Sequence, residues 1–139
     1  MVDVRGAWST AQLDAFLDEA TVPLRLAART PSDHPWIVPL WFVYRDGEFF
    51  CATGRSADIV DFLDRDDRLG FDVSTNEPPY RGVRGAGEAT IEPDPDKALL
   101  RELLERYLGG TDSALADRLL AADREEVRIA IEPSKLVTW

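Results

Sequence analysis

Two hydrophobic runs separated by a short turn form the clearest structural pattern in this sequence. The first run covers residues 36–44 and the second covers residues 49–53, with Asp46-Gly47 between them. Asp-Gly between aromatic and β-branched runs is typical of a tight hairpin, because both turn residues tolerate positive φ. The pattern therefore predicts two antiparallel strands that pair with each other.

Other segments before and after this hairpin also have strand-like patterns. They cover residues 22–29, 69–74, 80–91, 127–131 and 136–139. The segment 80–91 contains Gly82, Gly85 and Gly87, a density that indicates bulging or sharp curvature. Proline removes a ladder donor, so we expect Pro133 to separate the last two strands.

Helical periodicity appears between the strands. It covers residues 10–19 and 57–65, a longer stretch that opens at residues 93–96 and stops at 109–110, and a weaker stretch at 113–122. Ser9 and Gln12 have the spacing of a capping box at the first helix. Ser56 is expected to cap the second helix. In the long stretch, Pro95 suits the first turn of a helix.

Short antiparallel strands joined by hairpins, with helices in the connections, favour a mainly β (α+β) chain. We expect a closed or split antiparallel β-barrel with flanking helices, formed as a single domain over residues 1–139.

The order and spacing of these motifs resemble the pyridoxamine-5′-phosphate oxidase-like family of FMN-binding split β-barrels. The matching segments are residues 39–42, the turn at 46–47, the loop 53–56, the helix end at 63–68, the glycine-spaced strand 82–89 and the closing segment 133–139. The resemblance covers nearly the whole chain from residue 22 onward. It implies a homodimeric flavin-dependent oxidoreductase that uses FMN and acts on a small-molecule substrate.

For the flavin ring, the resemblance implies a position along the first hairpin at the interface between two subunits. The backbone and side chains there belong to Val38, Pro39 and Leu40. A terminal aromatic side chain of the partner subunit would approach the ring, and Trp139 is the residue in that position.

The FMN phosphate would lie at the turn after the second hairpin strand, next to Thr53, Arg55 and Ser56. Pyridoxamine-phosphate oxidases carry a Ser-Arg-Lys run before the following helix, where this sequence has Ser56-Ala57-Asp58. Because most of the phosphate-neutralising charge is missing, activity on a phosphorylated pyridoxamine is not expected. Arg55 is the nearest replacement, and the other candidates are Arg29, Arg81 and Lys135.

Two alternatives remain open. A deazaflavin (F420)-dependent reductase is one, because related split barrels hold that cofactor in a similar groove. The other is a non-catalytic barrel that binds a flavin, haem or another ligand, or only a partner protein, and the missing basic residues favour it.

Composition narrows the function classes. The net charge is −10, from 26 acidic and 16 basic residues scattered along the chain, and this argues against nucleic-acid binding. No apolar stretch approaches the roughly 20 residues that span a bilayer, so we expect no membrane insertion and a cytoplasmic location. His34 is the only histidine and has no ligand partner at metal spacing. The only cysteine, Cys51, is expected to be a buried strand residue.

Overall fold

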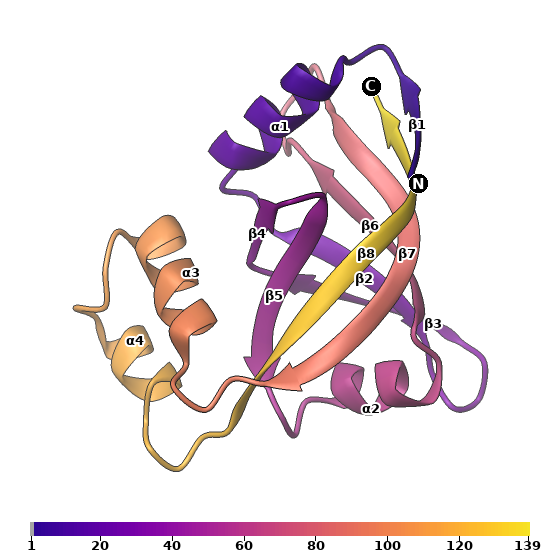
Figure 1. Ribbon diagram of the computed structural model, residues 1–139. Helices are drawn as coiled ribbons and strands as arrows, with labels where there is room; N and C mark the ends of the chain where they lie inside the picture. Colours follow the sequence, from indigo (N-terminus) through magenta and orange to yellow (C-terminus); the bar gives the residue numbers. More distant parts are fainter. Residues whose placement is uncertain (1) are drawn as a thin grey trace.

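The computed structural model describes residues 2–139, which form one sheet with helices outside it (Figure 1). The strands are β1 (Asp3–Gly6), β2 (Leu24–Arg29), β3 (Pro35–Leu40), β4 (Phe42–Arg45), β5 (Glu48–Gly54), β6 (Arg68–Ser74), β7 (Gly82–Pro93) and β8 (Glu126–Thr138). The helices are α1 (Thr10–Glu19), α2 (Asp58–Arg65), α3 (Ala98–Leu108) and α4 (Ala114–Leu119).

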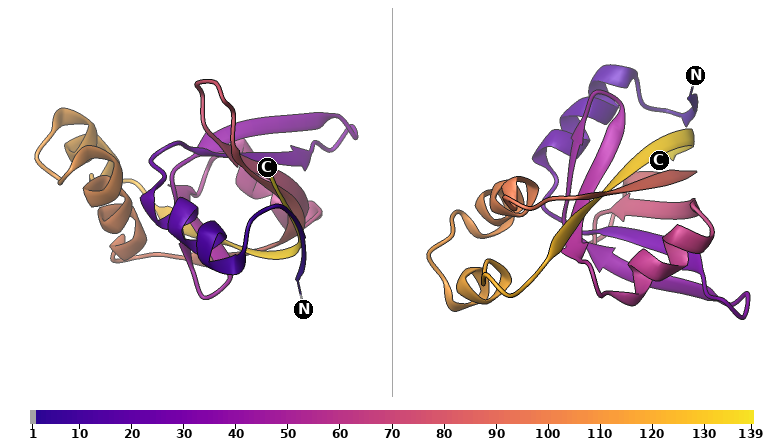
Figure 2. Two further views of the ribbon diagram at one scale, coloured as in Figure 1. Left: turned by 90° about the horizontal axis from the view of Figure 1, so that it is seen from above. Right: turned by 60° about the horizontal axis from the view of Figure 1, so that its bottom comes forward.

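The sheet curls into a split barrel. Its strands follow the order β3-β2-β6-β7-β8-β5-β4 with antiparallel neighbours throughout, and β1 adds to β8 in parallel. Strands β3 and β4 follow each other in the chain but lie at opposite ends of this order, so the sheet must bend round. Seen from above, the strands form a curled ring with α3 and α4 to one side (Figure 2). The predicted mainly β split barrel with flanking helices is confirmed.

The hairpin turn is confirmed, but its first strand is not continuous. Asp46 and Gly47 have φ of 53° and 79°, as a tight primed turn requires. The expected strand over residues 36–44 is interrupted at Trp41, so that β3 pairs with β2 and β4 pairs with β5. The indole of Trp41 instead stacks on the ring of Tyr107 in α3, with centroids 5.0 Å apart. A long-range aromatic contact therefore overrides the local strand pattern.

Strand β8 is continuous, so the predicted break at Pro133 is wrong. The register between β7 and β8 shifts here: Pro133 lies opposite Gly87, and Lys135 lies opposite Ala86. This leaves Ser134 as an extra residue, and its hydroxyl donates to the carbonyl of Ala86 at 3.2 Å. A β-bulge therefore accommodates the proline without ending the strand.

The glycines of β7 produce the expected close packing. A Cβ on Gly85 would collide with the carbonyl oxygen of Lys135, and one on Gly87 would collide with that of Glu132. The curvature of β7 thus depends on backbone atoms of β8 coming close to these two positions.

Aromatic residues fill the barrel interior. Phe49 is fully buried, and its ring lies 4.8 Å from that of Phe71 and 5.8 Å from that of Phe42 between centroids. Cys51 is also fully buried in β5, and burial raises the pKa of its thiol to about 12. Cys51 is therefore a buried strand residue, as predicted.

A second apolar layer covers the outside of β4 and β5. Leu99 and Leu103 of α3 pack with Val43, while Leu100 and Leu104 pack with Ala116 of α4. Each fully buried leucine contributes roughly 1.5–3 kcal/mol relative to an exposed one. This layer fixes α3 and α4 on the barrel and so positions the loops at their ends.

Helix α1 begins as the sequence predicts. Ser9 accepts from the backbone N–H of Gln12 at 3.1 Å, and the Gln12 side chain accepts from the Ser9 N–H at 2.8 Å, which completes a capping box. Its C-terminal end is held by Arg106 of α3, whose guanidinium donates to the carbonyls of Leu17 and Ala20.

The starts of α2 and α3 differ from the prediction. Ser56 does not cap α2, because Ala57 occupies the N-cap position and makes no side-chain capping bond. Helix α3 starts at Ala98, later than Pro95 suggested, after Lys97 in a left-handed conformation with φ of 55°. Asp94 caps it by accepting from the N–H groups of Ala98 and Leu99 at 3.2 and 3.0 Å.

Candidate functional site

The loop between β5 and α2 is tied down by its backbone while its side chains stay free. The N–H of Arg55 donates to the carbonyl of Glu125 at 2.9 Å, and that of Ala57 donates to Gly54 at 3.0 Å. The Arg55 and Ser56 side chains are exposed and have no hydrogen bond or ion pair within residues 2–139. Both groups are therefore available to a ligand.

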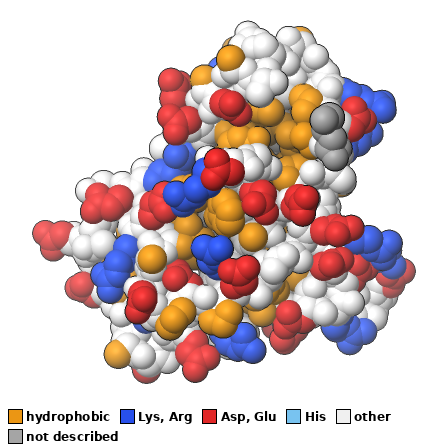
Figure 3. All heavy atoms as spheres, in the orientation of Figure 1, with side chains coloured by type: hydrophobic (Ala, Val, Ile, Leu, Met, Phe, Trp, Pro, Cys, Tyr) orange, Lys and Arg blue, Asp and Glu red, His pale blue; other side chains and the backbone are white. Residues whose placement is uncertain are grey.

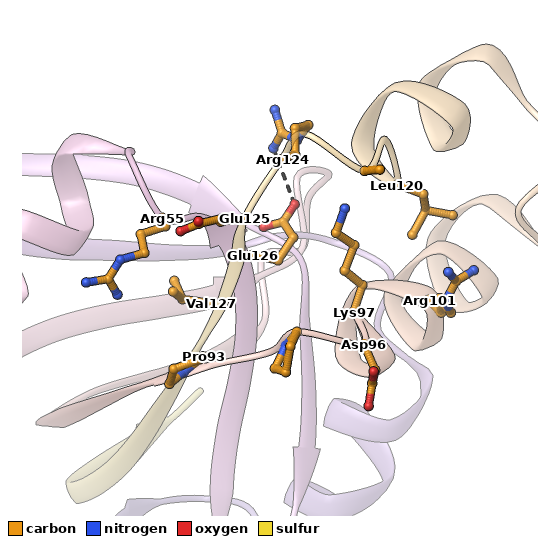
Figure 4. Close-up of a pocket in the computed structure, with 12 residues that line it drawn as sticks. Arg55, Pro93, Asp96, Lys97, Arg101, Leu120, Arg124, Glu125, Glu126 and Val127 are labelled. Atoms are coloured by element: carbon orange, nitrogen blue, oxygen red, sulfur yellow. Dashed lines mark hydrogen bonds and ion pairs between the residues drawn. The ribbon is translucent and has the colours of Figure 1, made fainter.

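A second guanidinium reaches this loop from the segment between α4 and β8. An Nη atom of Arg124 would lie only 3.3 Å from a Cβ placed on Gly54, so glycine leaves the room for this approach. Arg124, Arg55 and Ser56 line a hollow of about 340 Å³ together with Asp123 and Glu125. Two arginine side chains and a serine hydroxyl therefore line the same hollow, with Arg55 and Arg124 pointing in different directions (Figure 4).

A larger groove of about 780 Å³ adjoins the hollow and shares Arg55, Arg124 and Glu125 with it (Figure 4). Lys97, directly before α3, and Arg101 of α3 line its other side. Its volume falls in the range of roughly 300–1,000 Å³ that is usual for small-molecule sites. In Figure 4, Arg55 and Arg101 point away from each other at opposite ends of the groove.

Charged groups are buried beneath this groove. Lys97 is 8% exposed, and its ammonium donates to the carbonyl of Ala121 at 2.6 Å. Glu126 is 5% exposed, and one of its oxygens accepts from Arg124 at 3.3 Å. Burial raises the pKa of Glu126, while the hydrogen bond from Arg124 and the charges of Arg124 and Lys97 act in the opposite direction.

The residues predicted for the phosphate end lie together. Thr53 is half-buried and pairs with Val127 of β8, directly before the loop with Arg55 and Ser56. Arg124, which the sequence analysis missed, joins them. No local signal marks it, because its position depends on how the chain returns from α4 to β8.

The other basic candidates lie elsewhere in the chain. Arg29 pairs with Asp33 in the β2–β3 turn. The guanidinium carbon of Arg81 lies 4.8 Å from the ring centroid of Trp8. Lys135 lies in β8 at the bulge. Within one chain, none of the three contributes to the loop hollow.

The residues predicted for the ring end divide between the two faces of β3. Val38 and Leu40 are half-buried and pack against the barrel core, whereas Pro39 is exposed on the outer face. A ligand on the outer face of β3 would therefore meet Pro39 and the strand backbone before the side chains of Val38 and Leu40. Trp139 also lies on the outer face, where the guanidinium carbon of Arg84 lies 4.4 Å from the centroid of its ring.

The predicted ring-end residues belong to β3 and the C-terminal Trp139, whereas the predicted phosphate-end residues belong to β5 and the loop after it. Strand β8 runs between these two groups. This strand starts beside the loop hollow, where Val127 pairs with Thr53, and ends next to Trp139. A single chain therefore does not bring Trp139 to the loop, and a second copy would be needed to do so.

Other site chemistries find little support in the structure. Within residues 2–139, no group of His, Cys, Asp or Glu side chains could hold a metal ion. No helix in this part of the chain is long and apolar enough to cross a membrane. On the face shown in Figure 3, basic side chains lie among acidic ones.

Solved structures share this fold. A conserved hypothetical protein from Mycobacterium tuberculosis is 26% identical, with a TM-score of 0.77, over 96% of this chain and 85% of that one. An F420 reductase is 24% identical, with a TM-score of 0.72, over 86% of this chain and 92% of that one. A Listeria innocua protein assigned as a pyridoxamine 5′-phosphate oxidase is 17% identical, with a TM-score of 0.67, over 89% of this chain and 92% of that one.

The chain has the split-barrel fold of these solved structures. The similarity shows the fold alone, since no family model and no curated protein matches the sequence. The split barrel of this chain carries its candidate site at the loop hollow of Gly54, Arg55, Ser56 and Arg124.

Proposed function

We propose that this split barrel is a homodimeric flavin-dependent oxidoreductase that binds FMN, with the phosphate in the loop hollow. The observation that carries the proposal is that Arg55, Arg124 and Ser56 line one hollow, with Arg124 next to Gly54. The basic run that precedes the helix in pyridoxamine-phosphate oxidases is missing here. Arg124 supplies a second positive charge from a different part of the chain.

The donors in the hollow fit a phosphate monoester. Such a group carries about −1.5 to −2 charges at pH 7, and arginine matches it with paired N–H donors. Arg55 has no ion-pair partner in the described part of the chain, and the Ser56 hydroxyl adds a neutral donor. Asp123 and Glu125 at the rim lower the affinity by repulsion.

When bound, FMN supplies the redox chemistry, and the protein contributes binding, orientation and exclusion of water. In this chain Arg55, Arg124 and Ser56 would hold the phosphate. Pro39 and the backbone of β3 would support the ring on the outer face of the barrel. The substrate is a small molecule that reaches the ring from solvent.

The outer face of the sheet supports a homodimer. Ile37, Ala27, Gly70 and Ala86 lie side by side across β3, β2, β6 and β7, and Ile37 is 65% exposed. Small residues give this face low relief, so another sheet could approach closely. A twofold copy would bring its Trp139 towards Pro39 of the first chain, which gives the ring site a second wall.

Sedimentation tests the dimer. We expect a species of twice 15.5 kDa at micromolar concentration, and Ile37→Glu should dissociate it because a charge would be buried in the interface. Leu108→Glu, at an exposed apolar position on α3, is the control and should leave the dimer intact. A wild-type monomer that does not change on dilution would contradict the proposed ring site.

Titration with FMN and riboflavin tests the phosphate site. Charge-assisted hydrogen bonds contribute roughly 1.5–3 kcal/mol, so Arg55→Ala should weaken FMN binding about ten- to a hundredfold. Riboflavin has no phosphate and should lose almost nothing. Arg101→Ala, at the far end of the groove, is the matched control and should leave both affinities unchanged. Equal losses for FMN and riboflavin would assign Arg55 to loop structure instead.

The similarity to an F420 reductase favours a second candidate, a deazaflavin (F420)-dependent reductase. Competition between FMN and F420, followed by their different visible spectra, decides between the two cofactors. If the wild type binds neither, the chain is a non-catalytic barrel.

A further inference from the structure

The acid that holds Arg124 lies beside the loop hollow, in the wall of the larger groove. Glu126 is the first residue of β8 and lies directly opposite Gly54 in the ladder with β5. Its side chain is 2% exposed, whereas that of Arg124 is 39% exposed. The buried acid therefore contacts one Nη atom of Arg124, while the Arg124 side chain as a whole is partly exposed to solvent.

The buried polar atoms of the Glu126–Arg124 pair do not all have hydrogen-bond partners. Glu126 Oε1 accepts from Arg124 at 3.3 Å, while Glu126 Oε2 and Arg124 Nε are buried without a hydrogen-bond partner in the described structure. Burying a carboxylate without full hydrogen bonding is unfavourable. The Glu126 carboxylate is therefore not expected to stabilise the folded protein.

Neighbouring charges do not replace this contact. The ammonium of Lys97 donates to the Ala121 carbonyl, and both oxygens of Asp94 accept from the first N–H groups of α3. Lys97 favours the charged form of Glu126 and Asp94 opposes it. Among these groups, Arg124 is the only one that hydrogen-bonds to the Glu126 side chain.

We infer that Glu126 is a positioning residue, which holds the guanidinium of Arg124 over Gly54 so that its remaining N–H donors face the phosphate end of the cofactor site. The inference rests on the proposed function. Arginine has five N–H donors in a rigid plane, so a carboxylate that fixes one edge also orients the others. Holding a flexible side chain in its binding geometry lowers the entropy lost on binding.

A double-mutant cycle tests this role, with FMN and riboflavin as probes of wild type, Glu126→Gln, Arg124→Ala and the double variant. Glu126→Gln should weaken FMN about tenfold, because the orienting charge-assisted bond is lost, and should leave riboflavin unchanged. In the Arg124→Ala background the same substitution should change nothing further. Glu125→Gln removes the same charge from the exposed neighbouring residue and is the matched control, which should not weaken FMN.

The stability of Glu126→Gln distinguishes a positioning role of Glu126 from a structural one. Because burial raises the pKa of Glu126 in the folded state, the folded protein binds its proton more tightly than the unfolded chain does. Its carboxyl therefore favours folding most below the unfolded value of 4.5 and loses that contribution as pH rises through the higher folded value. Glu126→Gln should thus be at least as stable as wild type towards urea at pH 7, even though it binds FMN less tightly.

Additive losses in the cycle, equal loss of riboflavin, or an unchanged FMN affinity in Glu126→Gln would overturn the inference. If wild type binds FMN no better than riboflavin, the phosphate site itself fails. The ¹⁵Nε resonance of Arg124 then decides the positioning role without a cofactor. It should be that of an ordered side chain in wild type and motionally averaged in Glu126→Gln, and identical spectra would reject the inference.

Discussion

The barrel interior and the loop hollow differ in the kind of side chains that they bury. Inside the barrel, the ring of Phe49 packs against those of Phe42 and Phe71 within a cluster of apolar side chains. Beside the hollow, Glu126 and Arg124 are held together although each has a buried polar atom without a partner. Apolar packing stabilises the first region, whereas the second tolerates unfavourable burial, which is expected where a protein binds a ligand.

Removing the central ring of the interior should have the largest effect on stability. Phe49→Ala should lower the free energy of unfolding by about 3–5 kcal/mol, because it deletes a fully buried aromatic side chain and leaves a cavity. Urea denaturation measures the loss. A decrease below about 1 kcal/mol would show that the ring is not central to packing.

Tyr107 of α3 packs against the barrel core, and its hydroxyl should matter next. It accepts from the N–H of Phe42 at 3.2 Å and donates to the carbonyl of Val22 at 3.0 Å. Tyr107→Phe leaves these backbone groups without their partner and should lower the free energy of unfolding by about 1–3 kcal/mol. Tyr80→Phe, at a residue that is 61% exposed, is the control and should be neutral. Equal stability of the two variants would place the hydroxyl of Tyr107 in contact with water instead.

The smallest effects should distinguish two serines. Ser9→Ala removes a capping box and should lower the free energy of unfolding by about 0.5–2 kcal/mol. Ser56→Ala removes no capping bond and should stay within about 0.5 kcal/mol of wild type. Ser56→Ala should instead weaken FMN binding slightly. The same urea series measures both variants, and a larger loss for Ser56→Ala would show that this serine does support α2.

Local patterns in the sequence predicted the features that depend on local chemistry. The Asp46-Gly47 turn, the capping box of Ser9 and the close packing at Gly85 all follow from residues near each other or from backbone sterics. They also predicted a closed or split barrel, because the periodicity of apolar residues determines which faces are buried, and the resemblance to a known family selected the split form.

Features that depend on distant parts of the chain could not be read in this way. Trp41 interrupts a strand because it stacks on Tyr107, and Pro133 continues one because β7 provides a bulge. The parallel pairing of Asp3–Gly6 with β8 was not predicted at all. Arg124 reaches the loop only after α3 and α4 have packed, so half of the charge at the candidate site was missed.

Titration of the wild-type protein with FMN and with riboflavin, side by side at pH 7, tests the central claim most directly. The two ligands differ only in the phosphate that Arg55 and Arg124 are proposed to hold. With two charge-assisted contacts, FMN should bind about a hundredfold more tightly than riboflavin. Equal affinities, or no binding of either ligand, would contradict a phosphate site in this loop.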